Sequence, residues 1–386
     1  MKFTSIFKTA KMIKEMVNKP VNVNNSNAFG AESTDLKHLV KEAFEKIGHA
    51  NILIAGKTGV GKSTLVNAVF QGNLADTSIG HPVTQTIKEY SKEGEPVHIF
   101  DTKGFELQNY KEIIKELKGE ITRRKQMGDP KQMIHLVWFC ISNEGKRLED
   151  SEIDCINQLA TEVPVVVVLT KCLDANLDFY DLIKAECTNA TDVVRVLALQ
   201  YETPIGTIPS FGLDRLIDST YELVPDIAKA ALAASQQVNE SVTKRAVDKT
   251  IALAATSAAA IGATPIPFSD AVLLAPVQIG MISNICKIMK VKANRQFMTT
   301  LISSAAGVTG ATVTGRAIVR GLIKFIPGAG VIIGGTISAA TAGVLTSGMG
   351  YAFYNAVRLM QGKGADINAA DLSKVFVEQL KKTDLF

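Results

Sequence analysis

Apolar residues form several short, unbroken runs in the first half of the chain. These runs occupy residues 52–55, 135–141 and 163–169, which is typical of strands buried on both faces of a sheet. Residues 86–91 and 97–100 predict two more strands, joined as a hairpin by a short polar connection. A last short strand is expected over residues 204–209.

Apolar residues at helical spacing separate these runs. They predict helices over residues 34–47, 110–125, 148–160 and 177–199. A further helix follows the glycine-rich stretch at residues 56–63 without a break. Strands that alternate with helices favour an α/β fold, with a mostly parallel central sheet covered by helices on both faces.

The pattern changes after about Pro225, because no convincing strand follows and helical runs dominate. Residues 250–269 and 325–357 carry no charge, and the second run exceeds the roughly 20 residues that a membrane-spanning helix needs. Pro327 and many glycines interrupt it, which equally suits a tight helical hairpin in a soluble bundle. An amphipathic helix is expected over residues 368–382.

Residues 1–17 predict a basic amphipathic helix, which could anchor the chain at a membrane surface or pack on the protein itself. Residues 18–33 read as a linker because they are rich in Asn and lack periodicity. We therefore expect an α/β domain over residues 34–224 and an all-α apolar domain over residues 225–386, with membrane association of the latter left open.

Composition narrows the function classes. The chain has 386 residues, of which 46% are hydrophobic, so it is long enough for two domains. Its net charge is only +4, without a basic stripe interleaved with aromatics, so no nucleic-acid partner is expected. The five cysteines show no metal-ligand spacing and lie in apolar patterns, which predicts buried, reduced thiols and a cytoplasmic protein.

The stretch GKTGVGKS at residues 56–63 carries the clearest chemistry, since it fits the phosphate-binding pattern G-x-x-x-x-G-K-[ST] between a strand and a helix. In that pattern backbone N–H groups converge on an anion at the start of the helix. Lys62 would reach the β- and γ-phosphates, and Ser63 would offer its hydroxyl to Mg²⁺. The expected nucleotide contacts are Lys57, Thr58, Gly59, Val60, Gly61, Lys62, Ser63 and Thr64.

Two later stretches complete this site. The sequence DTKG follows the strand that ends at Phe100; there Asp101 would hold Mg²⁺ through water and the Gly104 N–H would contact the γ-phosphate. Between the two motifs, Thr84 offers a mobile hydroxyl to Mg²⁺, unless it is merely part of a hydroxyl-rich loop that enters a strand. Lys62, Thr84 and Gly104 are therefore the expected catalytic residues.

Together with the strand at residues 165–171, these motifs resemble an Era-like GTPase of the translation-factor-related class over about residues 48–222. The phosphate loop is similar to those of septin, immunity-related and immune-associated GTPases. Residues 264–271 and the helices around them resemble a helical domain of unknown function that often follows such GTPases in bacteria. The resemblance implies GTP or GDP and Mg²⁺ as ligands, with base-side contacts from Thr170, Lys171, Asp174 and Ser210.

Two departures from the family pattern matter. The guanine-reading motif is [NT]-K-x-D, but residues 170–174 read TKCLD, so Asp174 lies one position late. Either Asp174 still reaches the base, or no side chain reads guanine in the family's way; GTP remains favoured over ATP. Phe105 stands where many small GTPases place a water-positioning Gln, so slow intrinsic hydrolysis is expected.

Gly59 occupies the position where potassium-activated relatives keep an Asn, which favours activation by dimerisation across the nucleotide. Arg147 and His81 are candidates to act in trans, or are ordinary solvated side chains. His98 and His135 lie in strand patterns and are expected to have structural partners rather than to bind ligands.

The sequence thus predicts a slow, Mg²⁺-dependent GTPase that acts as a nucleotide-controlled switch. The switch would control homodimerisation and engagement of a membrane surface or membrane protein, in the cytoplasm or at the inner face of the cell membrane. The alternatives are a nucleotide-binding scaffold with negligible hydrolysis and an effector that perturbs membranes through the glycine-rich hairpin.

Overall fold

The computed structural model of the chain describes residues 48–70, 81–82, 87–91, 96–102, 110–204, 206–262, 270–293, 296–298, 300–301, 339–362 and 367–382. The expected N-terminal helix, the linker and the helix over residues 34–47 lie outside this part. Thr84, Gly104 and Phe105 lie outside it as well, so their roles stay predictions.

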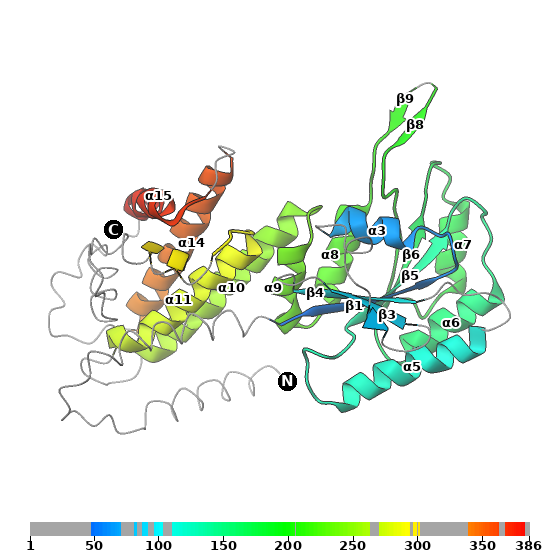
Figure 1. Cartoon of the computed structure of the whole chain (residues 1–386), viewed down its shortest axis with the longest axis horizontal. Coiled ribbons are helices and arrows are strands. Elements are labelled where there is room, and N and C mark those ends of the chain that lie inside the picture. Colours follow the sequence, from blue (N-terminus) through cyan, green and yellow to red (C-terminus); the bar gives the residue numbers. More distant parts are fainter. Residues whose placement is uncertain are drawn as a thin grey trace.

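The first part of the chain is built on a sheet with the strand order β2-β3-β4-β1-β5-β6-β7 (Figure 1). The strands are β1 (Ala50–Gly56), β2 (His81–Pro82), β3 (Ile87–Ser91), β4 (Val97–Thr102), β5 (Leu136–Ser142), β6 (Val165–Thr170) and β7 (Asp192–Arg195). Strands β4, β1, β5, β6 and β7 pair in parallel, whereas β2 and β3 extend the sheet antiparallel. The expected mostly parallel sheet is confirmed.

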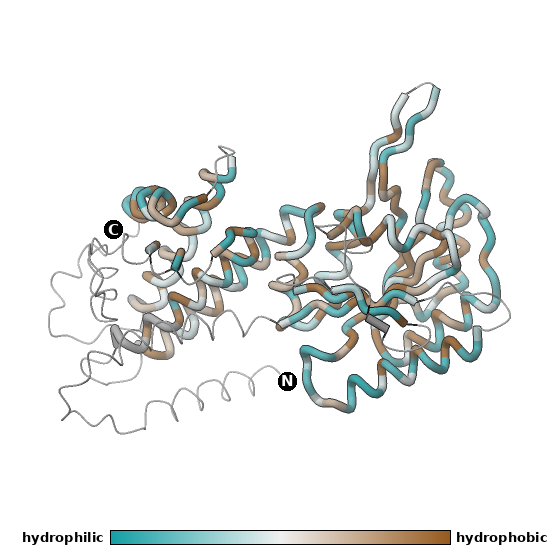
Figure 2. The backbone as a smooth tube through the Cα atoms, viewed as in Figure 1, coloured by the Kyte–Doolittle hydropathy of each residue, from teal (hydrophilic) through white to brown (hydrophobic). Residues whose placement is uncertain are grey.

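Helices cover both faces of this sheet. One face packs against α3 (Lys62–Val69), α8 (Leu213–Leu223) and α9 (Asp226–Ser235), and the other against α5 (Tyr110–Gln126), α6 (Asp150–Ala160) and α7 (Asp178–Glu186). In β1, Ile52 and Ile54 belong to the first core and Leu53 and Ala55 to the second, because successive side chains of a strand point to opposite faces. Figure 2 shows hydrophobic residues through the central strands and hydrophilic residues along most of α5.

One expectation for the end of this domain is wrong and another is confirmed. The helix expected over residues 177–199 ends at Glu186, and β7 follows it. The polar stretch at residues 188–192 breaks the helix, and the β-branched valines after it favour a strand. The last short strand expected over residues 204–209 is present as β9 (Gly206–Ile208), which pairs with β8 (Tyr201–Thr203) in a separate projecting hairpin (Figure 1).

The C-terminal part includes the helices α10 (Glu240–Gly262), α11 (Asp270–Ile288), α14 (Ala339–Gln361) and α15 (Ala369–Lys382), which follow α9. Helices α10 and α14 pack closely, since a Cβ atom at Gly350 would lie 2.7 Å from Ile251 Cγ1. Within the described ranges, no helix is both long and apolar enough to cross a membrane. Parts of both uncharged runs lie outside these ranges.

The phosphate-loop helix α3 is fastened to the start of the helical region. Its C-cap, Phe70, forms a β-bridge with Gln236, and the Gln237 N–H donates to the Val69 carbonyl oxygen at 3.0 Å. Lys290 at the end of α11 donates to the Gln236 carbonyl oxygen at 2.6 Å. Backbone and side-chain contacts therefore join the end of α3 to the connection between α9 and α10 and to the residues that follow α11.

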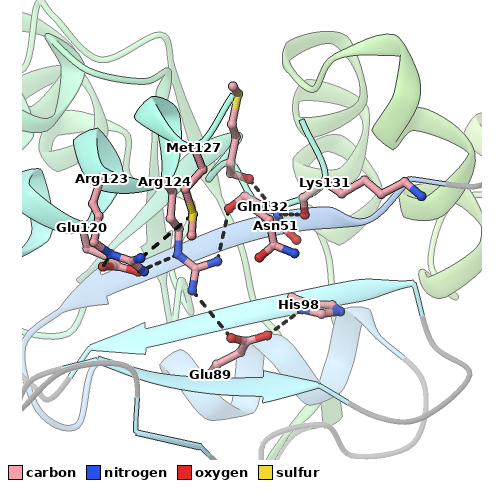
Figure 3. A network of polar contacts seen from close by, with 10 residues as sticks. Asn51, Glu89, His98, Glu120, Arg123, Arg124, Met127, Lys131 and Gln132 are labelled. Carbon is pink, nitrogen blue, oxygen red and sulfur yellow. Dashed lines mark hydrogen bonds and ion pairs between the residues drawn. The ribbon is translucent and has the colours of Figure 1, made fainter. Parts of the chain in front are cut away.

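A polar network ties α5 to the antiparallel edge of the sheet (Figure 3). Arg124 donates to Glu120 at 2.6 Å, lies 3.7 Å from a Glu89 oxygen, and places its guanidinium 4.3 Å from the centre of the Phe100 ring. Glu89 also contacts His98 Nδ1 at 2.6 Å. The expectation that His98 has a structural partner is thus confirmed. His135 also has a structural partner, since its Nδ1 accepts a hydrogen bond from the backbone N–H of Asn51 on β1 at 3.1 Å.

Candidate functional site

The loop between β1 and α3 depends on glycine at its two ends. Gly56 has φ 138° and Gly61 has φ 96°, conformations that side chains with a Cβ rarely adopt. A Cβ at Gly56 would also lie only 2.3 Å from the Cys140 carbonyl oxygen on β5. The loop can therefore curl back over the sheet edge only because glycine stands at these positions.

The N-terminus of α3 is free to receive an anion. Gly61 is its N-cap, no side chain caps it, and its first turn holds no acidic residue. Lys62 folds back over the loop, and its Nζ donates to the carbonyl oxygens of Gly56 at 2.9 Å and Lys57 at 3.0 Å. An uncapped helix N-terminus beside an ammonium group is suited to binding phosphate groups.

A pocket of about 570 Å³ opens over this helix end. Its lining residues are Thr58, Gly59, Gly61, Lys62, Ser63, Thr64, Lys88, Tyr90, Asp101, Thr102 and Lys171. The structure thus brings most of the predicted loop contacts together with Asp101 and Lys171. Sequence analysis missed Lys88 and Tyr90, which alternate on β3; Lys88 pairs directly with Asp101 on β4.

Asp101 fits a divalent cation. Its Oδ1 is buried and has no hydrogen-bond partner among the described groups. Burial raises the pKa of this carboxyl, against the lowering effect of Lys62 and Lys88. The Ser63 hydroxyl belongs to the same pocket, so an orphaned carboxylate oxygen and a hydroxyl are available for the hard-oxygen coordination that Mg²⁺ prefers.

Three predicted contacts take other positions. Thr170 is buried, and its hydroxyl lies 2.6 Å from the Val60 carbonyl oxygen, so it holds the phosphate loop from below. The Lys57 side chain points to α6, where its Nζ lies 2.9 Å from Glu149. Ser210 is exposed at the base of the projecting hairpin and does not line the pocket. Neither Lys57 nor the buried Val60 lines the pocket.

The residues expected to contact the base lie in the loop that follows β6, next to the loop that follows β5. Lys171 lines the pocket, and its Nζ contacts Glu144 at 2.8 Å. Asp174 lies outside the pocket lining and pairs with Lys146 at 3.0 Å. Glu144 and Lys146 belong to no sequence motif; they could have been suspected only because they follow the carboxyl end of a buried strand, where α/β sheets bind ligands.

Of the two groups proposed to act in trans, only Arg147 can be described at the side-chain level. Its side chain is 77% exposed, with its Nε 3.5 Å from Glu149. For His81, the structure gives only a backbone position on β2.

Two family models match different parts of the chain. Residues 51–171 match the 50S ribosome-binding GTPase family, and residues 226–384 match a domain of unknown function, DUF697. The first match covers the phosphate loop, Asp101 and Lys171, and the second covers the helical region. The second match begins at residue 226, close to the expected end of the α/β domain at residue 224.

Curated relatives include cell division control protein 10 of Saccharomyces cerevisiae, 27% identical over 189 residues, covering 41% of this chain and 58% of the relative. Neuronal-specific septin-3 of Rattus norvegicus is 27% identical over 183 residues, covering 40% and 50%. The chain thus spans about half of the length of the curated relatives it matches.

Among solved structures, the septin GTPase domain from Chlamydomonas reinhardtii aligns with a TM-score of 0.33 and 17% identity, covering 48% of this chain and 97% of that domain. A probable GTP-binding protein engB aligns with a TM-score of 0.31 and 18% identity, covering 45% and 98%. From the family and sequence matches, the chain carries a P-loop GTPase domain related to septins, followed by a helical region that matches a family of unknown function.

Proposed function

We propose that this chain binds GTP with Mg²⁺, hydrolyses it slowly and uses the difference between GTP and GDP as a conformational switch. The observation that carries the proposal is the pocket itself, in which the uncapped start of α3, the Lys62 ammonium and the orphaned Asp101 oxygen face one space. These groups complement a triphosphate and its metal ion.

The chain's own groups account for the binding and the stabilisation of charge. Lys62 and the loop N–H groups hold the β- and γ-phosphates and stabilise the negative charge that develops in the transition state. Ser63 and Asp101 would hold the metal, with Thr84 as the expected third ligand. When bound, Mg²⁺ supplies neutralisation of the phosphate oxygens.

We expect slow hydrolysis because no residue at the usual position can orient the attacking water. No glutamine stands after Gly104 to orient the attacking water; Phe105 occupies that position and offers no polar atom. We therefore propose that a second copy of the chain completes the site, and that self-association controls the rate.

The switch would act through the two loops that flank β3 and β4. Lys88 on β3 and Asp101 on β4 line the pocket and lie opposite one another, and the chain leading to Thr84 and Gly104 continues from these strands. Ordering of those loops by the γ-phosphate would expose or cover a surface for a second copy, a membrane surface or a membrane protein. The five cysteines are free and buried, which supports a cytoplasmic place for this chain.

The test is GTP and ATP hydrolysis by the full chain over a wide range of protein concentrations, with Lys62→Ala as the control. The proposal predicts a GTP-selective rate that rises more than proportionally with concentration and that Lys62→Ala abolishes. A flat, negligible rate combined with tight GTP binding would contradict the switch and support a nucleotide-binding scaffold.

A further inference from the structure

Successive residues of β3 face opposite sides of the sheet. Ile87 belongs to the core on the α5 side, and a Glu89 carboxylate oxygen lies 3.7 Å from an Arg124 nitrogen of α5 (Figure 3). Since side chains alternate along a strand, Lys88 and Tyr90 face the other side, where α3 and the phosphate loop lie. Both residues line the pocket over the start of α3. Strand β3 therefore adds a lysine to this pocket.

Lys88 lies beside the carboxylate that is suited to a metal ion. It pairs in register with Asp101 on the neighbouring strand β4, and directly opposite Cβ atoms in such a pair are about 4.5–5.5 Å apart. Burial raises the pKa of the Asp101 carboxyl, and the charges of Lys62 and Lys88 lower it. The two ammonium groups therefore lie close enough to the same carboxylate to stabilise its charge.

The lysines that line the pocket differ in what holds them. Lys62 donates to two carbonyl oxygens of the phosphate loop, and Lys171 contacts Glu144 at 2.8 Å. Lys88 is exposed, and among the described residues it makes no hydrogen bond or ion pair. Its ammonium group is therefore available to an anionic ligand in the pocket without the loss of a contact to the described part of the protein.

The order of the strands places Lys88 and Lys171 at opposite ends of the pocket. Lys171 follows β6, two strands from β1 on one side, whereas Lys88 lies on β3, two strands from β1 on the other. The start of α3, which follows β1, lies between them. With the base at Lys171, as the family resemblance implies, the phosphates cross the start of α3 and the terminal phosphate points towards β4 and β3.

We propose that Lys88 contacts the γ-phosphate of the bound triphosphate and is a catalytic residue of this chain. This inference rests on the proposed nucleotide function. The Lys88 ammonium donates hydrogen bonds to γ-phosphate oxygens, so it favours GTP over GDP and stabilises the negative charge of the transition state. Because this cation comes from the same chain, it supports the slow hydrolysis that a single copy carries out.

The reaction needs no proton transfer from Lys88. The oxygen of water forms a bond to the γ-phosphorus, and the bond from that phosphorus to the bridging oxygen breaks. The bridging oxygen keeps the electron pair and leaves with GDP, and the proton of the water passes to the released phosphate. Lys88 stays protonated throughout and acts only through its charge and its hydrogen bonds.

The test is equilibrium binding of GTP and GDP, with Mg²⁺ and without any metal, to the full chain, Lys88→Met and Lys88→Arg. Lys88→Met keeps the aliphatic stem but removes the charge. It is expected to weaken GTP binding about tenfold in both conditions and GDP binding less than about twofold, since GDP has no γ-phosphate. Lys88→Arg keeps the charge and should retain most of the preference for GTP. Lys115→Met, which removes an exposed lysine on α5 at the opposite face of the sheet, is the matched control and should change neither affinity.

Hydrolysis of saturating GTP at a low, fixed protein concentration gives a second readout. Lys88→Met is expected to lower kcat about tenfold, and Lys88→Arg to recover part of the rate. A lysine with a purely structural role on β3 would not change the ratio of GTP to GDP affinity in a folded variant. Thermal unfolding of each variant confirms that it is folded.

Two outcomes overturn the inference while the proposed function stands. If Lys88→Met left the ratio of GTP to GDP affinity unchanged, Lys88 would not contact the γ-phosphate. If the ratio changed but kcat did not, Lys88 would have no catalytic role. If the wild-type chain bound neither nucleotide, the proposed function itself would fail.

Discussion

At the scale of single residues, the candidate site depends on a few side chains whose positions are set by their surroundings, such as the Lys62 ammonium and the buried Asp101 carboxyl. Lys62, Ser63 and Asp101 could be identified from the sequence because each lies inside a short contiguous motif next to a strand. Lys88 and Lys146 could not, because their position depends on strand register and on loop contacts between segments far apart in the chain.

Gly56 gives the first prediction at this scale. Gly56→Ala forces a Cβ against the Cys140 carbonyl oxygen at a positive φ. We therefore expect the free energy of unfolding to fall by about 1–3 kcal/mol, and nucleotide binding to weaken because the loop is displaced. Gly119→Ala is the control: it lies inside α5 with nothing within 4 Å of the added Cβ, and should stabilise by about 1 kcal/mol. Chemical denaturation compares the two; equal effects would refute the steric account of the loop.

Asp101 gives the second. Because burial raises its pKa, the folded state holds this proton more tightly than the unfolded chain, so the carboxylate opposes folding at neutral pH and this opposition fades as pH falls. Without nucleotide, Asp101→Asn should therefore raise the unfolding free energy by about 1 kcal/mol. It should also weaken Mg²⁺-dependent nucleotide binding.

The pH dependence follows from the same carboxyl. Metal binding needs the carboxylate, so in the wild-type chain Mg²⁺-dependent affinity should fall on acidification at a higher pH than an ordinary Asp would give. Asp101→Asn should lack this step. Titrating Mg²⁺-dependent affinity at several pH values checks this, and an identical pH profile in both proteins would contradict the role of Asp101.

At the scale of elements, the sequence revealed the parallel strands because their runs are uniformly apolar. It failed at residues 187–199, where the apolar spacing looked helical although the β-branched Val193 and Val194 belong to an edge strand. It predicted the short strand before Pro209 correctly but not its partner β8, because the pattern of apolar residues alone does not say which strand a short strand pairs with. In the structure this strand pairs with β8 in the projecting hairpin and does not join the seven-stranded sheet.

The network beneath α5 gives the prediction at this scale. Arg124 is buried between Glu120, Glu89 and the Phe100 ring. Arg124→Ala removes the buried guanidinium and its contact with the ring, while Glu120 keeps Arg123 and Glu89 keeps His98, so it should cost about 2 kcal/mol of unfolding free energy. Arg123→Ala removes a neighbouring arginine that pairs with the same Glu120 but is 53% exposed, and should cost under about 1 kcal/mol. Thermal unfolding separates the two, and similar losses would show that Arg124 does not anchor α5.

At the scale of the whole molecule, the nucleotide pocket and the helical region share a structural connection. Helix α3 begins at the phosphate loop and ends where Phe70 forms a β-bridge with Gln236, the C-cap of α9, and Lys290 after α11 donates to the same Gln236. The sequence indicated two domains through its change in composition near Pro225, but this contact was invisible to it. The connection gives a route by which a bound phosphate could bias the helical region.

The central claim is that the phosphate loop forms a binding site for GTP, and equilibrium binding tests this claim most directly. We would titrate Mg²⁺ with GTP, and separately with ATP, into the full chain and into Lys62→Ala. The account predicts GTP-selective binding that weakens at least about tenfold in Lys62→Ala, because that ammonium is the main cation on the phosphates. Equal affinity of the two proteins for GTP would contradict it.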